Sequence, residues 1–237
     1  MKMHSLVVDK LAAGYDGRPV LEDFSLCLSS EERVAVVGPN GCGKSTLLRA
    51  VTAEISKDSG RVLFCGIDIT EMRTDAIARL GFGYLRQDHN VFPGLSVEDN
   101  VRLAASGAGN GDLDAETSIF DTFPVLGDIR HNRAGVLSGG ERQLLAVAMV
   151  LSRPIRILFL DEPVAGLSQK NATELLDCIF SFQRQMRFAV LMAEHRLKLI
   201  RPYVSRVIVM VRGEIAEDTK ETEILEDRKR IERYYSL

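Results

Sequence analysis

A short apolar run that leads directly into a glycine-rich loop constrains the fold of this chain most strongly. Val34-Ala35-Val36-Val37 carries no polar side chain, as expected of a strand buried on both faces of a sheet. The following loop, from Gly38 to Thr46, fits the pattern G-x-x-x-x-G-K-[ST]. Apolar residues after Thr46 then predict a helix through about Glu54. Strand, loop and helix in this order predict a phosphate-binding loop in an α/β core.

The loop supplies the chemistry that a nucleoside triphosphate needs. Backbone N–H groups at the start of a helix favour an anion, because they have no partner within the helix. Lys44 is expected to reach the β- and γ-phosphates, and Ser45 to ligate Mg²⁺. The predicted nucleotide-binding residues here are Gly38, Pro39, Asn40, Gly41, Cys42, Gly43, Lys44, Ser45 and Thr46. A glycine-rich loop without a ligand is the alternative, and the strand–loop–helix context argues against it.

Two acids end a second apolar run. Ile157-Leu158-Phe159-Leu160 precedes Asp161 and Glu162. The carboxyl ends of parallel strands form the crevice where ligands bind in such sheets. Asp161 therefore suits a magnesium site, and Glu162 suits the activation of a water molecule. A solvated acidic turn is the alternative, which the P-loop upstream makes less favourable.

A second group of small residues stands nearly a hundred residues further along the chain. Ser138-Gly139-Gly140-Glu141 precedes a predicted helix over 141–151, and it offers a second cradle for an anion. One nucleotide needs one cradle. The segment is therefore expected to face outward and to bind the phosphate of a nucleotide held by another subunit. The alternative is a capping box, in which Ser138 and Glu141 simply start the helix.

Three further residues are weaker candidates from their positions alone. His195 follows the apolar strand 188–192 and could contact a γ-phosphate. Gln87 follows the strand 82–85 and could touch Mg²⁺ or water, and the ring of Tyr15 could stack on a base. Spacing alone favours an ordinary structural role for all three.

Strand and helix signals alternate along most of the chain. This alternation predicts a mostly parallel sheet flanked by helices. Asp16-Gly17 between two apolar strands predicts an N-terminal antiparallel β subdomain. Residues 87–156 read as an inserted helical subdomain, with helices starting near Ser96 and around 114–122. We thus expect one domain, 1–237, with its α/β core in 1–86 and 157–237.

Composition limits the partners, the cysteine-based sites and the membrane roles that we expect. The 237 residues carry a net charge of −3, so we expect no attraction to nucleic acid. The 4 cysteines are widely spaced and predict neither a zinc site nor a disulfide framework. The N-terminus lacks the pattern of a signal peptide, and no apolar run reaches the ~20 residues that cross a bilayer. Any membrane role is therefore expected to depend on a partner.

Taken together, these motifs closely resemble the ATP-binding subunit of ATP-binding-cassette (ABC) transporters, over essentially the whole chain. By this resemblance, Tyr15 is the base-stacking aromatic residue and Gln87 the glutamine of the Q-loop, which contacts Mg²⁺. Residues 137–141 match the signature sequence. Asp161 and Glu162 match the Walker B aspartate and the catalytic glutamate, and His195 the switch histidine. Lys44, Gln87, Glu162 and His195 are the implied catalytic residues.

The family mechanism implies several partners. Two ATPase subunits would pair head to tail, with ATP and Mg²⁺ between the P-loop of one and Ser138–Glu141 of the other. Transmembrane permease subunits would dock near residues 87–101 and place the chain at the cytoplasmic face of the membrane. An extracytoplasmic solute-binding protein is a further implied partner. A soluble ABC ATPase, and a P-loop kinase or GTPase, are the alternatives.

A narrower resemblance concerns the cargo. Val91-Phe92-Pro93-Gly94-Leu95-Ser96-Val97-Glu98-Asp99-Asn100 is similar to a stretch typical of branched-chain amino-acid importers. ATPases for urea or amide uptake and for lipopolysaccharide export share much of it. One position departs from the family: Ser168 stands where many members carry the aspartate of the D-loop. This departure leaves open whether the second ATPase subunit is identical or different.

Overall fold

The central sheet of the molecule is six-stranded and almost entirely parallel. A computed structural model describes residues 4–88, 90–106 and 119–235. Strand order in the central sheet is β10-β9-β3-β8-β7-β6, and the β9–β10 pair alone among these neighbours is antiparallel. Its strands are β3 (Arg33–Val37), β6 (Phe82–Leu85), β7 (Ile157–Asp161), β8 (Ala189–Ala193), β9 (Arg206–Val211) and β10 (Glu214–Thr219). The predicted mostly parallel sheet is thus present.

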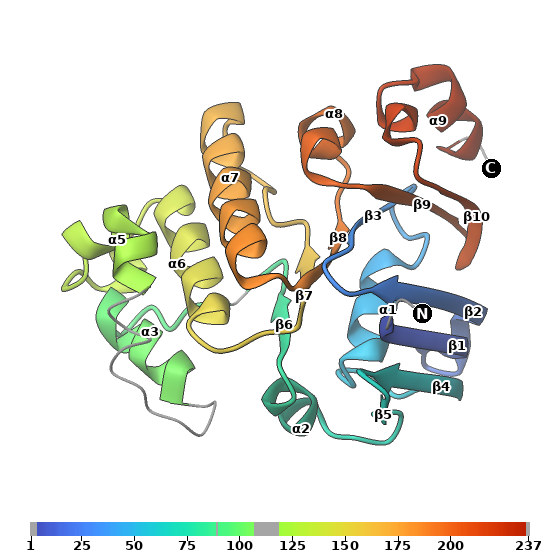
Figure 1. Cartoon of the computed structure of the whole chain (residues 1–237), viewed down its shortest axis with the longest axis horizontal. Coiled ribbons are helices and arrows are strands. Elements are labelled where there is room, and N and C mark those ends of the chain that lie inside the picture. Colours follow the sequence, from blue (N-terminus) through green and yellow to red (C-terminus); the bar gives the residue numbers. More distant parts are fainter. Residues whose placement is uncertain (1–3, 89, 107–118, 236–237) are drawn as a thin grey trace.

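A second, antiparallel sheet is formed by the N-terminal part of the chain (Figure 1). It has the order β2-β1-β4-β5, built from β1 (His4–Tyr15), β2 (Arg18–Ser29), β4 (Ser59–Phe64) and β5 (Ile67–Asp68). Asp16 and Gly17 join β1 to β2 with positive φ angles of 51° and 71°. Positive φ at both central residues is what a tight hairpin turn requires, so the predicted hairpin is confirmed.

Helices cover both faces of the central sheet. The α-helices whose bounds lie in the described ranges are α1 (Lys44–Val51), α2 (Thr74–Arg79), α3 (Val97–Ser106), α5 (Pro124–Asp128), α6 (Gly139–Leu151), α7 (Gln169–Met186), α8 (Leu197–Ile200) and α9 (Arg228–Tyr235). Short 3₁₀ helices occur at η1 (Ala134–Val136), η2 (Arg201–Tyr203) and η3 (Thr222–Leu225). In the ranges that the structure describes, no helix is long and apolar enough to cross a membrane.

One predicted helix is shorter than expected, and another lies partly outside the described residues. The helix after the P-loop ends at Val51 rather than near Glu54, because Ala53 has a φ of 57°, which a continuing right-handed helix does not allow. Of the helix expected around 114–122, residues 119–122 are helical, whereas 114–118 lie outside the described residues.

The core consists of two apolar layers, one on each face of the central sheet. Alternate residues of a strand point to opposite faces. Leu158 and Leu160 of β7 accordingly pack with α6 and α7, whereas Ile157 and Phe159 pack with α1 and the antiparallel sheet. Burial on both faces explains why β3, β7 and β8 read as continuous apolar runs. Their carboxyl ends lie along one edge, where polar residues follow.

Helices α3, α5 and α6 gather at the end of the molecule opposite the antiparallel sheet (Figure 1). Asn100 of α3 fastens the segment that enters this region. It is fully buried, its Oδ1 accepts the N–H of Phe92 at 2.8 Å, and its Nδ2 donates to the carbonyls of Phe92 and Ser96 at 3.0 and 2.8 Å. The buried side chain therefore bonds three backbone groups of this segment, which are partly shielded from water.

We predict that Asn100→Ala lowers the free energy of unfolding by about 3 kcal/mol, because it empties a fully buried side-chain position and removes the partners of the Phe92 N–H and carbonyl. Urea denaturation followed by circular dichroism measures this change. Arg102→Ala on the same helix is the control: its side chain is 55% exposed, so removing its ion pair with Glu98 should cost less than about 0.5 kcal/mol. Equal effects of the two substitutions would contradict the role given to Asn100.

Candidate functional site

The P-loop connects β3 to α1 and lies against the rest of the core. Gly38 has a φ of 153°, in the region that favours glycine, and a Cβ there would stand 2.1 Å from the carbonyl oxygen of Met210 in β9. Gly43 has a φ of 109°, and a Cβ there would come within 3.1 Å of Leu21. Glycine is therefore required by close packing at one end of the loop and by backbone conformation at both ends.

The start of α1 fits a phosphate group. No acidic residue lies in its first turn, so the unpaired N–H groups and the helix dipole favour an anion. The side chain of Lys44 is held over the loop, because its Nζ donates to the carbonyls of Gly38 and Pro39 at 2.8 and 3.0 Å. Burial raises the pKa of the Cys42 thiol, which keeps a thiolate away from the phosphate position. The cradle thus combines cationic and neutral donors.

Ser45 and Asp161 provide two oxygen atoms beside this cradle. Ser45 Oγ donates to Asp161 Oδ1 at 3.0 Å, and the hydroxyl of Tyr84 lies 3.4 Å from Asp161 Oδ2. Asp161 is 1% exposed, and burial raises the pKa of its carboxyl group. A hydroxyl and a carboxylate are hard oxygen ligands of the kind that Mg²⁺ prefers. The donor set therefore fits a magnesium ion.

Gln87, Glu162 and His195 converge at the same edge of the sheet, from the ends of three neighbouring strands. Gln87 Nε2 donates to Glu162 Oε2 at 3.1 Å, and His195 Nδ1 lies 3.9 Å from Glu162 Oε1. Glu162 has a φ of 48°, which is rare for a residue with a side chain and is often found at active sites. The structure thus places Gln87 and His195, for which spacing alone favoured an ordinary structural role, on either side of Glu162.

Glu194 belongs to this site and was not predicted from the sequence. It is fully buried, and its Oε1 accepts the backbone N–H groups of His195 and Arg196 at 2.8 and 3.0 Å. His195 Nδ1 lies 3.2 Å from the same oxygen. The available signal was an acid placed directly between the apolar strand β8 and a histidine. A charged residue in that position is unusual unless hydrogen bonds satisfy it.

Tyr15 lies at the end of β1 and is 41% exposed. A hydrogen bond with its hydroxyl raises the pKa of Arg49, which lies on α1, the helix that the P-loop starts. An exposed aromatic ring next to this helix can stack on a planar base.

The segment 138–141 begins α6 as a capping box. Ser138 Oγ accepts the N–H of Glu141 at 3.3 Å, and Glu141 Oε2 accepts the N–H of Ser138 at 2.8 Å. A Cβ on Gly139 would meet no atom within 4 Å. Within the described ranges, no hydrogen bond links this segment to residues 38–46. The cap is therefore real, and the N-terminal face of α6 at Gly139 is open.

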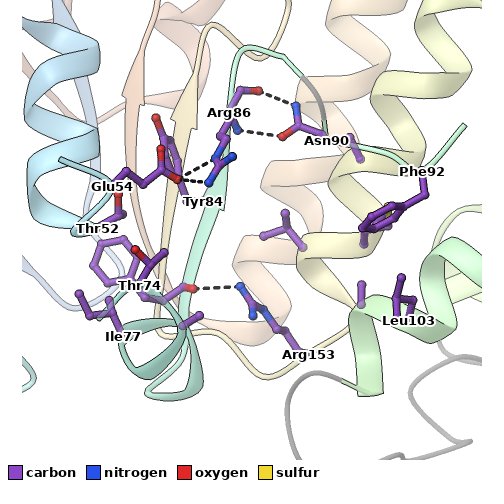
Figure 2. A pocket seen from close by; sticks show the side chains of 16 residues that line it. Thr52, Glu54, Thr74, Ile77, Tyr84, Arg86, Asn90, Phe92, Leu103 and Arg153 are labelled. Atoms are coloured by element: carbon purple, nitrogen blue, oxygen red, sulfur yellow. Dashed lines mark hydrogen bonds and ion pairs between the residues drawn. The ribbon is translucent and has the colours of Figure 1, made fainter. Parts of the chain in front are cut away.

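A groove of about 420 Å³ is lined by core residues on one side and by residues of α3 and α6 on the other (Figure 2). On the core side, Arg86 pairs with Glu54, with 2.5 Å between the guanidinium and the carboxylate. On the opposite side, Phe92 and Leu103 line the groove and are 51% and 46% exposed. Arg153 closes one end by donating to the carbonyl of Phe82 at 3.1 Å. Exposed apolar side chains with charged residues around them are typical of a protein-binding surface.

Comparison with known proteins identifies the family. The family model described as "ABC transporter" matches residues 21–165. A probable branched-chain amino acid transport ATP-binding protein of Archaeoglobus fulgidus is 36% identical over 93% of this chain and 94% of its own. The lipopolysaccharide export system ATP-binding protein of Escherichia coli K12 is 32% identical over 98% of this chain and 97% of its own.

The fold agrees with this assignment. The crystal structure of a nucleotide-free ATP-binding cassette from an ABC transporter superposes with a TM-score of 0.86 at 24% identity, and the match covers 98% of this chain and 99% of that one. The predicted α/β P-loop fold is therefore confirmed. The chain belongs to the ABC transporter family, as one of its ATP-binding and ATP-hydrolysing subunits.

Proposed function

We propose that this chain forms half of a composite ATP site and drives transport through permease subunits. The observation that carries the proposal is the meeting of six polar side chains at one edge of the central sheet. These residues are Lys44, Ser45, Gln87, Asp161, Glu162 and His195. An anion cradle, two hard oxygen ligands and a carboxylate beside a histidine are the parts that phosphoryl transfer to water requires.

Each residue has a distinct part in this proposal. The P-loop and Lys44 bind the phosphates, and the exposed ring of Tyr15 stacks on the adenine base. Ser45, Asp161 and Gln87 hold Mg²⁺, which when bound would neutralise charge on the phosphate oxygens. Glu162 accepts a proton from the attacking water, and His195 donates a hydrogen bond to the γ-phosphate as negative charge develops there.

A second ATPase subunit completes the site. The open N-terminal face of α6 at Gly139, lying away from this chain's own P-loop, supports a contact in trans. Ser138, Gly139, Gly140 and Glu141 would then cover a nucleotide held by the other subunit. ATP would join the two subunits, and hydrolysis would release them.

We predict that Glu162→Gln abolishes ATP turnover and keeps ATP binding, because glutamine retains the shape of the side chain but cannot accept a proton. A loss of at least about 100-fold in kcat is expected from removing a general base. Steady-state phosphate release measures turnover, and a fluorescent ATP analogue measures binding. Glu174→Gln, an exposed acid on α7, is the control that should leave both unchanged. Wild-type turnover by Glu162→Gln would exclude Glu162 as the base.

The groove of Figure 2 supports the second half of the proposal. It lies next to Gln87, since Arg86 forms part of its wall. A helix of a permease subunit that enters it would contact Phe92 and Leu103, and its position would be sensed by the Q-loop. We propose that residues 87–156 form the helical subdomain that moves in response. The chain would act at the cytoplasmic face of the membrane.

For the cargo, we propose uptake of branched-chain amino acids, with an extracytoplasmic solute-binding protein as a further partner. The 36% identity to a probable branched-chain amino acid transport protein and the motif at 91–100 support this choice. Lipopolysaccharide export is the second candidate, because the relative with that role aligns over nearly the full length of both chains.

We predict that deleting the gene lowers uptake of radiolabelled leucine in intact cells to less than about a tenth of normal. Restoring the wild-type gene should restore uptake, whereas a Lys44→Ala gene should not, because the lysine that binds the phosphates is lost. Uptake of a labelled sugar controls for general damage to the membrane. Normal uptake of leucine, isoleucine and valine in the deletion strain would refute the proposed cargo.

A further inference from the structure

The residues on either side of His195 form hydrogen bonds with different parts of the structure. Glu194 bonds the backbone of residues 195 and 196, and Arg196 bonds the loop that follows Glu162. Glu194 is fully buried, and its Oε1 accepts the N–H groups of both His195 and Arg196. The other oxygen of Glu194 is buried and has no hydrogen-bond partner in the part of the chain that the structure describes. Such a buried carboxylate is costly, and its hydrogen bonds are concentrated on the backbone that carries His195. Glu194 therefore anchors this short segment to the end of β8.

Arg196 holds the loop that follows Glu162. Residues 163–168, which we call the 163–168 loop, connect Glu162 to the start of α7. One guanidinium nitrogen of Arg196 donates to the carbonyls of Val164 and Leu167 at 3.4 and 3.0 Å. The other donates to Gln169 Oε1 at 2.7 Å. Hydrogen bonds from a charged donor are stronger than neutral ones, and the planar fork of arginine fixes their direction.

The same loop is held from its other side by α6. Gln143 Nε2 donates to the carbonyl of Pro163 at 2.8 Å. At the end of the loop, Ser168 caps α7 by accepting the N–H of Asn171 at 3.2 Å. The loop therefore connects α6, which starts at the signature segment, with the segment that carries His195. A shift of α6 would be passed through the loop to Arg196.

We propose that Arg196, anchored by Glu194, is a positioning residue that locks the 163–168 loop to His195 and so keeps His195 beside Glu162. The proposal rests on the roles given above to Glu162 and His195. Arg196 does not touch the nucleotide in this account. It acts by coupling the loop that follows β7 to the loop that follows β8, so that the two loops move together.

Hydrogen exchange of the isolated chain tests the lock directly. The amides of Ala165 and Leu167 bond to the carbonyls of Glu162 and Val164 at 3.1 and 3.2 Å within the loop. Arg196→Met keeps an unbranched stem of four heavy atoms but removes the guanidinium donors, so these amides should exchange at least about tenfold faster by local opening. Lys198→Met, an exposed lysine on α8, is the matched control and should leave their exchange unchanged.

Kinetics of the same variants test the consequence for the reaction. Arg196→Met should lower kcat for ATP hydrolysis by about tenfold, because a displaced His195 stabilises the transition state less well. KM for ATP should stay within about twofold, and the thermal midpoint within about 2 °C. Arg196→Lys keeps the charge but not the fork, so it should recover only part of the loss.

His195→Ala separates failure of this proposal from failure of the proposed function. If His195→Ala loses turnover while Arg196→Met keeps wild-type kcat and wild-type exchange, the lock is refuted and the role of His195 stands. If His195→Ala retains turnover, the role proposed for His195 is wrong, and the exchange rates of Ala165 and Leu167 alone decide whether Arg196 locks the loop. Faster exchange in Lys198→Met as well would also refute a specific role for Arg196.

Discussion

The hydrogen bond between Ser45 and Asp161 depends on the parallel pairing of the strands in the central sheet, which organises the whole molecule. Its two residues are 116 positions apart in the sequence, yet their oxygens lie 3.0 Å apart. Parallel pairing of β3 with β8 and of β8 with β7 brings this about, because parallel strands all end at the same edge. Burial of both faces of the sheet fixes the register of these strands, and the register sets the positions of the P-loop, Asp161 and Glu194.

Much of the fold and part of the site could be predicted from the sequence. The P-loop, Asp161 and Glu162 each follow an apolar run directly, so local pattern and position agree. Spacing alone favoured an ordinary structural role for Gln87 and His195, and the resemblance to a family was needed to single them out. Glu194 was missed because its partners are backbone N–H groups of the next two residues, which no side chain signals. Arg196 was missed because its partners belong to a loop that it meets only in the folded chain. Likewise, the positive φ of Ala53, which ends α1 early, has no signal in an alanine side chain.

The signature segment shows how one group of residues can serve two purposes. Ser138 and Glu141 form the capping box that starts α6, as the simpler interpretation of the sequence required. This cap uses the N–H groups at the N-cap and N3 positions, whereas those at N1 and N2, on Gly139 and Gly140, have no partner within a helix. Capping and binding of a phosphate in trans are therefore compatible. The same helix holds the 163–168 loop through Gln143, which links an event at the subunit interface to Glu162 and His195.

The central claim is that the ATP site is shared between two ATPase subunits. Cryo-electron microscopy of the assembled transporter, with Glu162→Gln and bound ATP, tests it most directly. The quantity to measure is a distance across the interface. It runs from Ser138 Oγ of this chain to the γ-phosphate of the ATP that is bound by the P-loop of the second ATPase subunit. The account predicts hydrogen-bond distance, about 3 Å, whether that subunit is identical or different. ATP enclosed by the P-loop of one subunit, with Ser138 of this chain far from any phosphate, would contradict it.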